Sequence, residues 1–216
     1  MQEIAMKGLH MQTITVAGDA IIIPDQYQIL DSMPEDPKDM VVVGLRTPEA
    51  MCIVHIVPIS RSRAMPFDDP QAVVDAIHHN MEDDQGLVEV CAQSIRSGGR
   101  LIDSVVKSSD AEIGGVQYTW TCDIQIRNAI LMFQGFFCED GMTGVRDATI
   151  FELARRHDWI TVDNQGIHGW AEDCYDPTYV RGNLPNLSED QRFDSMFPQH
   201  PLSMLRAFRQ VIVENN

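Results

Sequence analysis

The side chains best suited to chemistry lie close together in the last third of the chain. His168, Glu172, Asp173 and Asp176 supply one imidazole and three carboxylates, a donor set that could hold a divalent cation. Their spacing matches neither H-E-x-x-H nor a calcium loop, and a loop offers no fixed face on which ligands converge. A solvated acidic loop is therefore the simpler interpretation. A metal-dependent hydrolase built on His168, Asp173 and Asp176 is the alternative that these residues leave open.

Nucleophilic groups are present, but without the surroundings that activate them. Ser60 and Ser62 lack the glycines of a G-x-S-x-G turn, which argues against serine hydrolysis. His55 lies between Met51, Ile53 and other apolar residues and is interpreted as a core histidine bonded to a neighbour. The five cysteines are scattered with no C-x-x-C pair, so we expect free thiols in a reducing cytoplasm. The sequence predicts no catalytic residue, no metal and no cofactor.

Aromatic side chains are spread through the acidic segment 158–197. Large rings in a long loop usually attach that loop to the surface of the domain. They can instead stay exposed as anchors for a partner, because Trp and Tyr contribute much of the binding energy at interfaces. We take them as the candidate partner-binding residues, which are Trp159, Trp170, Tyr175, Tyr179, Phe193 and Phe197.

Composition excludes several classes of partner. The 216 residues carry 16 basic and 32 acidic side chains, a formal charge of −16, which repels nucleic acid and anionic membranes. No run of eighteen apolar residues predicts a membrane span, and the first residues have no basic region followed by an apolar core. We expect a cytoplasmic protein that binds neither nucleic acid nor membrane.

Strand-length segments dominate the first 140 residues. From Val116 to Ile126, apolar and polar residues alternate without a break, a period of two that a helix cannot produce. Gly18-Asp19 and Ser97-Gly98-Gly99 are typical hairpin turns. Segments 41–46 and 50–59 are apolar at nearly every position, so we expect both faces of the sheet to be covered there. The expected strands are 13–17, 20–24, 27–30, 41–46, 50–59, 87–95, 100–109, 116–126 and 129–138.

Three helices are expected. Asp69 followed by Pro70 is an N-cap signal for a helix that ends before Asp83. Residues 143–156 form a second helix, and Pro201 opens a terminal one whose apolar stripe is Leu202, Leu205, Phe208 and Ile212. We expect a single domain, 1–216, with a sheet-and-helix core (12–156), an acidic aromatic loop region (157–200) and a terminal helix (201–214).

The order of elements places helices against a twisted antiparallel sheet, an α+β fold. This order, with the pattern I-x-I-P-x-x-Y at residues 21–27, resembles the PsbP-like superfamily, which includes the bacterial DcrB-like proteins and a eukaryotic regulator of the GTPase Ran. The resemblance covers residues 12–156 and implies an α/β/α sandwich. Residues 157–216 depart from it, and we expect them to form a loop-rich C-terminal extension. It also implies a non-catalytic role, either binding another protein or acting as its chaperone.

We therefore expect a non-enzymatic, cytoplasmic, protein-binding or chaperone-like protein that holds a protein or peptide on its sheet or its aromatic loop. Its twelve methionines would suit an adaptable apolar surface. The polar strand face (Gln117, Thr119, Thr121, Asp123 and Gln125) is interpreted as solvated, with docking as the alternative. Besides the hydrolase, the remaining alternative is a homo-oligomer joined through an edge strand or the terminal helix.

Overall fold

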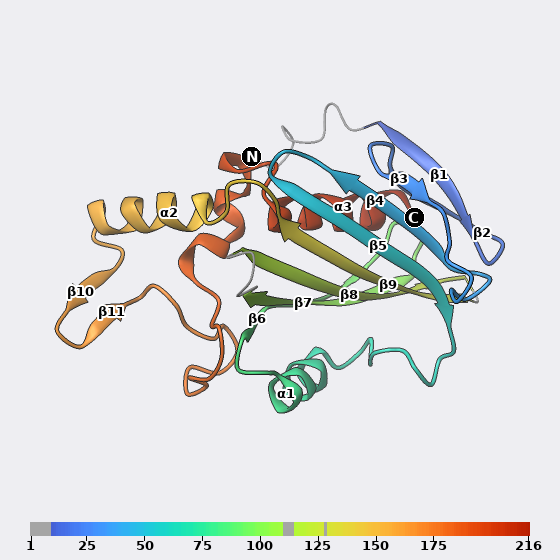
Figure 1. The fold of residues 1–216 in the computed structure, drawn as a ribbon. Coiled ribbons are helices and arrows are strands. Elements are labelled where there is room, and N and C mark those ends of the chain that lie inside the picture. The colour runs from blue at the N-terminus through green and yellow to red at the C-terminus, as the bar shows by residue number, and fades with distance from the viewer. Residues whose placement is uncertain (1–9, 110–114, 128) are drawn as a thin grey trace.

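A computed structural model describes residues 10–109, 115–127 and 129–216. Its centre is a seven-stranded sheet in the order β3-β4-β5-β9-β8-β7-β6, with every neighbouring pair antiparallel (Figure 1). The expected α+β fold is confirmed. The strands of this sheet are β3 (Gln28–Leu30), β4 (Val41–Arg46), β5 (Ala50–Ile59), β6 (Gln85–Ser94), β7 (Arg100–Ser109), β8 (Val116–Ile126) and β9 (Ala129–Glu139).

The alternation in β8 fixes which side chains enter the core. Tyr118, Trp120, Cys122 and Ile124 are all buried on one face of the sheet. Gly135 of β9 lies directly across from Trp120. A Cβ on Gly135 would approach the ring of Phe137 to 2.6 Å, so glycine is needed for the aromatic rings to pack here.

Helix α3 (Pro201–Asn215) lies across this face together with the hairpin of β1 (Met11–Val16) and β2 (Asp19–Pro24). The predicted helical stripe is confirmed, because all four of its residues belong to the main core. The turn of the hairpin is Ala17-Gly18, both at positive φ, and not Gly18-Asp19 as the sequence suggested, because Val16 pairs with Asp19. The stripe residues are Leu202, Leu205, Phe208 and Ile212.

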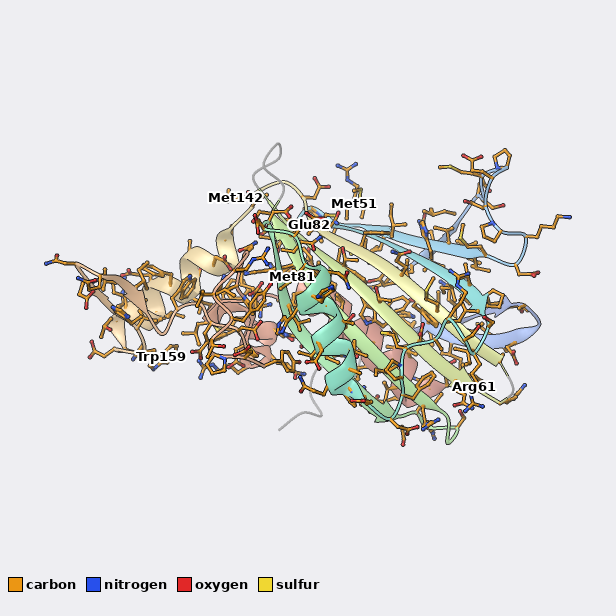
Figure 2. All side chains as sticks on the ribbon, turned by 90° about the horizontal axis from the view of Figure 1, so that it is seen from below. Met51, Arg61, Met81, Glu82, Met142 and Trp159 are labelled. Carbon is orange, nitrogen blue, oxygen red and sulfur yellow. The ribbon has the colours of Figure 1, made fainter. Side chains whose placement is uncertain are left out.

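The opposite face of the sheet is covered over only part of its width. Helix α1 (Pro70–Asn80) begins at the predicted Asp69 cap and packs on β6, where Val74 and Met81 meet Leu87. Figure 2 looks onto this side, with α1 over one edge of the sheet and the strands around Met51 uncovered. The expectation that both faces are covered is wrong for β5, where Met51 is exposed, but it is right for β4, whose Val42 and Gly44 are buried on the same side. The continuous apolar pattern of β5 gives no sign that a helix is missing from one of its faces.

The C-terminal extension contains more regular structure than the sequence suggested. Helix α2 (Val145–Arg156) leads into a short hairpin of β10 (Thr161–Asp163) and β11 (Gly166–His168), which extends away from the sheet (Figure 1). Two 3-10 helices, η1 (Leu187–Glu189) and η2 (Gln191–Met196), then return the chain to α3. No helix in the described part of the chain is long and apolar enough to cross a membrane.

Candidate functional site

The uncovered face of β5 and β9 is a half-exposed surface with apolar side chains, and we call it the open face. Register places Met51 across from Cys138, Ile53 from Phe136, His55 from Gln134 and Val57 from Met132. The exposed fraction of Met51 is 40%, and the other seven side chains are half-buried. The open face is therefore defined by Met51, Ile53, His55, Val57, Met132, Gln134, Phe136 and Cys138.

His55 belongs to this surface. Its ring meets Phe136 edge-on, with the ring centroids 6.1 Å apart. The interpretation of His55 as a core histidine is thus wrong, because the strand positions around it face outward where no helix packs. An imidazole beside a phenyl ring gives the open face a polar group within an apolar surface, as ligand-binding surfaces commonly have.

The open face has a polar border along β8. Thr119 lies across from Phe136 and Thr121 across from Gln134, and both threonines are half-buried. Asp123 is different, because the segment before α1 covers it and its Oδ2 accepts a hydrogen bond of 2.6 Å from the backbone N–H of Met65. Burial raises the pKa of Asp123 although the Met65 bond opposes this shift. The expectation of a wholly solvated polar face thus fails at Asp123.

One end of the open face deepens into a hollow of about 300 Å³, the size of a small ligand site. Ile59 and Ile130 form its apolar wall, and they pair with each other in the register of the open face. Ser60, Arg61 and Gln125 contribute polar groups. The hollow therefore extends the surface available to a bound segment.

The six aromatic side chains predicted to bind a partner have separate surroundings. Phe193 is buried, Trp170 packs edge-on against Phe151 at 5.0 Å, and Tyr179 stacks on His78 at 4.4 Å. Phe197 is half-buried below the guanidinium of Arg146. These contacts are those of rings that attach a loop to the molecule.

Two of the six rings, Trp159 and Tyr175, remain substantially exposed, at 45% and 36%. The hydroxyl of Tyr175 accepts a 2.5 Å hydrogen bond from the backbone N–H of Val90 on β6. Since β6 is an edge strand, this contact occupies a backbone group that could otherwise pair with another chain. Tyr175 thus protects the sheet edge. Partner binding by these aromatic residues stays a prediction.

The structure does not bring His168, Asp173 and Asp176 together as one candidate metal site. His168 contacts Asp163 at 3.2 Å within the exposed β10–β11 hairpin, whereas Asp173 is buried and contacts His78 of α1 at 2.9 Å. Asp173 also accepts the backbone N–H of Asp176, so it forms a turn. Within 10–109, 115–127 and 129–216, no three His, Cys, Asp or Glu side chains are arranged to hold a metal ion.

A buried network of charges, which sequence reasoning missed, holds the C-terminal extension on the sheet. Arg206 of α3 contacts Glu89 at 2.8 Å and Asp194 at 3.1 Å. Arg209 joins Glu89 at 2.7 Å to Asp103 at 3.1 Å. Asp103 in turn accepts a hydrogen bond of 2.7 Å from the indole N–H of Trp120. The carboxylate of Glu89 is therefore shared by two guanidinium groups, those of Arg206 and Arg209.

The same network continues to α2 and η1. The Arg146 guanidinium is almost fully buried and donates to the carbonyl of Ser188, the hydroxyl of Ser203 and the carboxylate of Asp194. A second pair, Lys107 with Glu189, is buried at 3.0 Å. Four acids and four bases are thus matched: Glu89, Asp103, Glu189 and Asp194 with Lys107, Arg146, Arg206 and Arg209.

Burial and charge shift the ionisation of these groups in different directions. Burial opposes ionisation of Glu89, but Arg209 and Arg206 prevail and lower its pKa. For Glu189, burial prevails over the nearby Lys107 and raises the pKa. His200, the N-cap of α3, has its pKa lowered to about 3 by burial and by the positive charges of Arg146 and Arg206. We therefore interpret the network as structural, because its charged groups are occupied with one another.

The solved structures that match this chain differ widely from it in sequence. A protein of unknown function from Pseudomonas aeruginosa is 16% identical, with a TM-score of 0.36 over 69% of this chain and 93% of its own. The Ran-binding protein Mog1p of Saccharomyces cerevisiae is 11% identical, with a TM-score of 0.39 over 67% and 84%. LpqN of Mycobacterium tuberculosis, involved in cell envelope biogenesis, is 14% identical, with a TM-score of 0.32 over 68% and 87%.

No family model matches the sequence, and no curated protein matches it either. The PsbP-like resemblance of residues 12–156 therefore stays a prediction. These identities and TM-scores assign no function to the chain.

Proposed function

We propose that this protein is a non-enzymatic, chaperone-like binding protein that holds an apolar segment of another protein on the open face. The observation that carries the proposal is an apolar sheet surface without a covering helix, in a chain whose other sheet face is fully occupied by α3 and the β1–β2 hairpin. Such a surface, bordered by polar groups, is typical of a protein–protein interaction site.

The side chains of the open face suit an adaptable interface. Met51 and Met132 are flexible and polarizable, so they can adjust to different apolar partners. Phe136 supplies a large rigid ring at the centre of the surface, and aromatic rings contribute strongly at interfaces. Cys52, Cys91, Cys122 and Cys174 have free thiols, which supports the proposal of a reducing compartment such as the cytoplasm.

The partner's charge follows from the segments that border the open face. Residues 31–40, 46–49, 60–69 and 139–140 together carry nine acidic and four basic side chains. A bound segment with basic residues beside its apolar ones is therefore favoured, and its affinity falls as salt screens this attraction.

The test uses a fluorescent peptide of about ten apolar residues, long enough to follow one strand, with lysines at both ends. We expect saturable binding by fluorescence anisotropy, weakened about fivefold or more by Met51→Glu, which buries a charge against the apolar segment. Met11→Glu is the matched control, because Met11 is equally exposed, at 37%, on the hairpin of the covered side. Absence of binding, or equal loss in both variants, would contradict the proposal.

A further inference from the structure

The hollow at the end of the open face has a chemistry of its own. Ile59, Ile130 and Gln125 lie in one row across three adjacent strands, because Ile130 pairs with Ile59 on one side and with Gln125 on the other. Figure 2 shows Arg61 at the opposite end of these strands from Met51. Four of the seven residues that line the hollow are apolar, and they can shelter a short apolar chain from water. These four are Pro58, Ile59, Ala129 and Ile130.

The three polar lining residues can all donate hydrogen bonds. Arg61 is exposed, and its guanidinium forms no ion pair within the described part of the chain. The Oε1 atom of Gln125 lies 3.5 Å from the guanidinium of Arg100, so the NH2 group of this amide is left to donate into the hollow. The hydroxyl of Ser60 shares a 3.0 Å hydrogen bond with that of Ser62. The hollow therefore offers one cation and two neutral donors.

The charge of the segments around the hollow favours an anion. Residues 58–63 and 125–130 carry three arginines and no acid, in a chain whose formal charge is −16. One of these arginines, Arg127, lies 3.7 Å from Asp19 and is partly neutralised. Arg61 lines the hollow without such a partner. The local charge is thus opposite in sign to that of the whole molecule.

Two acids that lie near these segments in sequence do not line the hollow. Asp123, two positions before Gln125, is buried and accepts the backbone N–H of Met65 at 2.6 Å. Asp68 is paired with Arg100. Among the described residues that line the hollow, none is acidic, so the positive charge of Arg61 is unmatched there.

We propose that the hollow binds a small monocarboxylate with a short apolar chain. The carboxylate accepts hydrogen bonds from Arg61 and Gln125, and the apolar chain lies against Ile59 and Ile130. One guanidinium matches one negative charge, whereas a phosphate carries more charge than this single cation balances. The site does not depend on the binding of a protein segment by the open face.

Hexanoate is the probe, and proton–nitrogen correlation spectra of the full chain report its binding residue by residue. We expect saturable shifts at the residues that line the hollow, with a dissociation constant in the millimolar range or below, as suits so small a ligand. Hexanol has the same chain without the charge, and hexylamine has the opposite charge. Both bind about fivefold more weakly or worse, as does inorganic phosphate, which has no apolar chain.

Three substitutions test the roles of the donors. Arg61→Gln raises the dissociation constant of hexanoate about fivefold or more, because it removes the one cation of the hollow. Arg63→Gln is the matched control: it removes the same charge two positions away, at an exposed residue outside the lining, and changes the constant by less than about twofold. Gln125→Glu keeps an oxygen toward Arg100 but replaces the NH2 donor with an oxygen and adds a negative charge. It raises the constant about tenfold or more.

Three results would overturn the inference: no saturable shifts around the hollow, hexanol binding as tightly as hexanoate, or equal losses in Arg61→Gln and Arg63→Gln. Met51→Glu separates the inference from the proposed function, because Met51 lies at the other end of the strands. This variant keeps its affinity for hexanoate while its affinity for the lysine-flanked peptide falls. A protein that binds the peptide but not hexanoate refutes the carboxylate site and leaves the proposed function intact, and the reverse result does the opposite.

Discussion

Acidification from about pH 7.5 to about pH 5 is expected to destabilise the fold through one residue, His200. Its imidazole is 9% exposed, and its Nδ1 accepts the backbone N–H of Leu202 at the start of α3. Burial of the imidazole, and then the positive charges of Arg146 and Arg206, lower its pKa from 6.5 to about 3. Protonation would also remove the acceptor of the Leu202 N–H.

The size of the effect follows from proton linkage. A histidine with a lowered native pKa contributes stability above its unfolded pKa of 6.5, and this contribution is lost progressively as the pH falls toward about 3. At pH 5 the unfolded chain is almost fully protonated at this position while the native state is not. The expected loss is about 2 kcal/mol relative to pH 7.5, from the difference in proton binding by the two states.

Urea unfolding followed by tryptophan fluorescence at both pH values measures this loss. His200→Asn keeps an N-cap acceptor but cannot titrate, so its free energy of unfolding should fall by about 2 kcal/mol less than that of the wild type. His79→Asn, an exposed substitution on α1, controls for removal of a histidine. If the wild type and His200→Asn lose the same stability on acidification, the explanation through a buried neutral imidazole is refuted.

Two further substitutions test the contacts of the extension. Arg146→Met should lower the free energy of unfolding by about 3–5 kcal/mol, because it leaves buried acceptors unpaired, while Arg156→Met, at an exposed arginine, should leave the urea midpoint unchanged. Tyr175→Phe should cost about 1 kcal/mol and speed aggregation on heating, measured by light scattering, because it frees the N–H of Val90 at the sheet edge. Equal midpoints for the two arginine variants, or unchanged aggregation of Tyr175→Phe, would contradict these expectations.

Local signals predicted the regular elements well. The alternation from Val116 to Ile126 gave β8 with its buried side correct, and the Asp69-Pro70 signal gave the first residue of α1. Both depend on residues within a few positions of each other, where periodicity and capping act directly. The β10–β11 hairpin escaped notice because three residues per strand are too few to show a period.

The candidate site could not be predicted, because it depends on contacts between distant segments. Glu89 and Arg206 are separated by 117 positions, and nothing in either neighbourhood indicates the other. The open face depends on where α1 lies, and the apolar residues of β5 look alike whether a helix covers them or not. Met51 is exposed and the next residue, Cys52, is buried. Nothing in the local sequence predicts which of these two faces of β5 is left without a helix.

The buried network also changes the ratio of acidic to basic side chains that a partner can meet. Its four acids and four bases neutralise one another, so they contribute nothing to the charge seen by a partner. Taking four from each count of 32 and 16 leaves 28 acidic and 12 basic side chains for the rest of the molecule. More than two acids for each base therefore remain outside the network, a stronger bias than the composition indicates. Any partner of the open face must approach through this field, which favours basic segments and keeps copies of this chain apart.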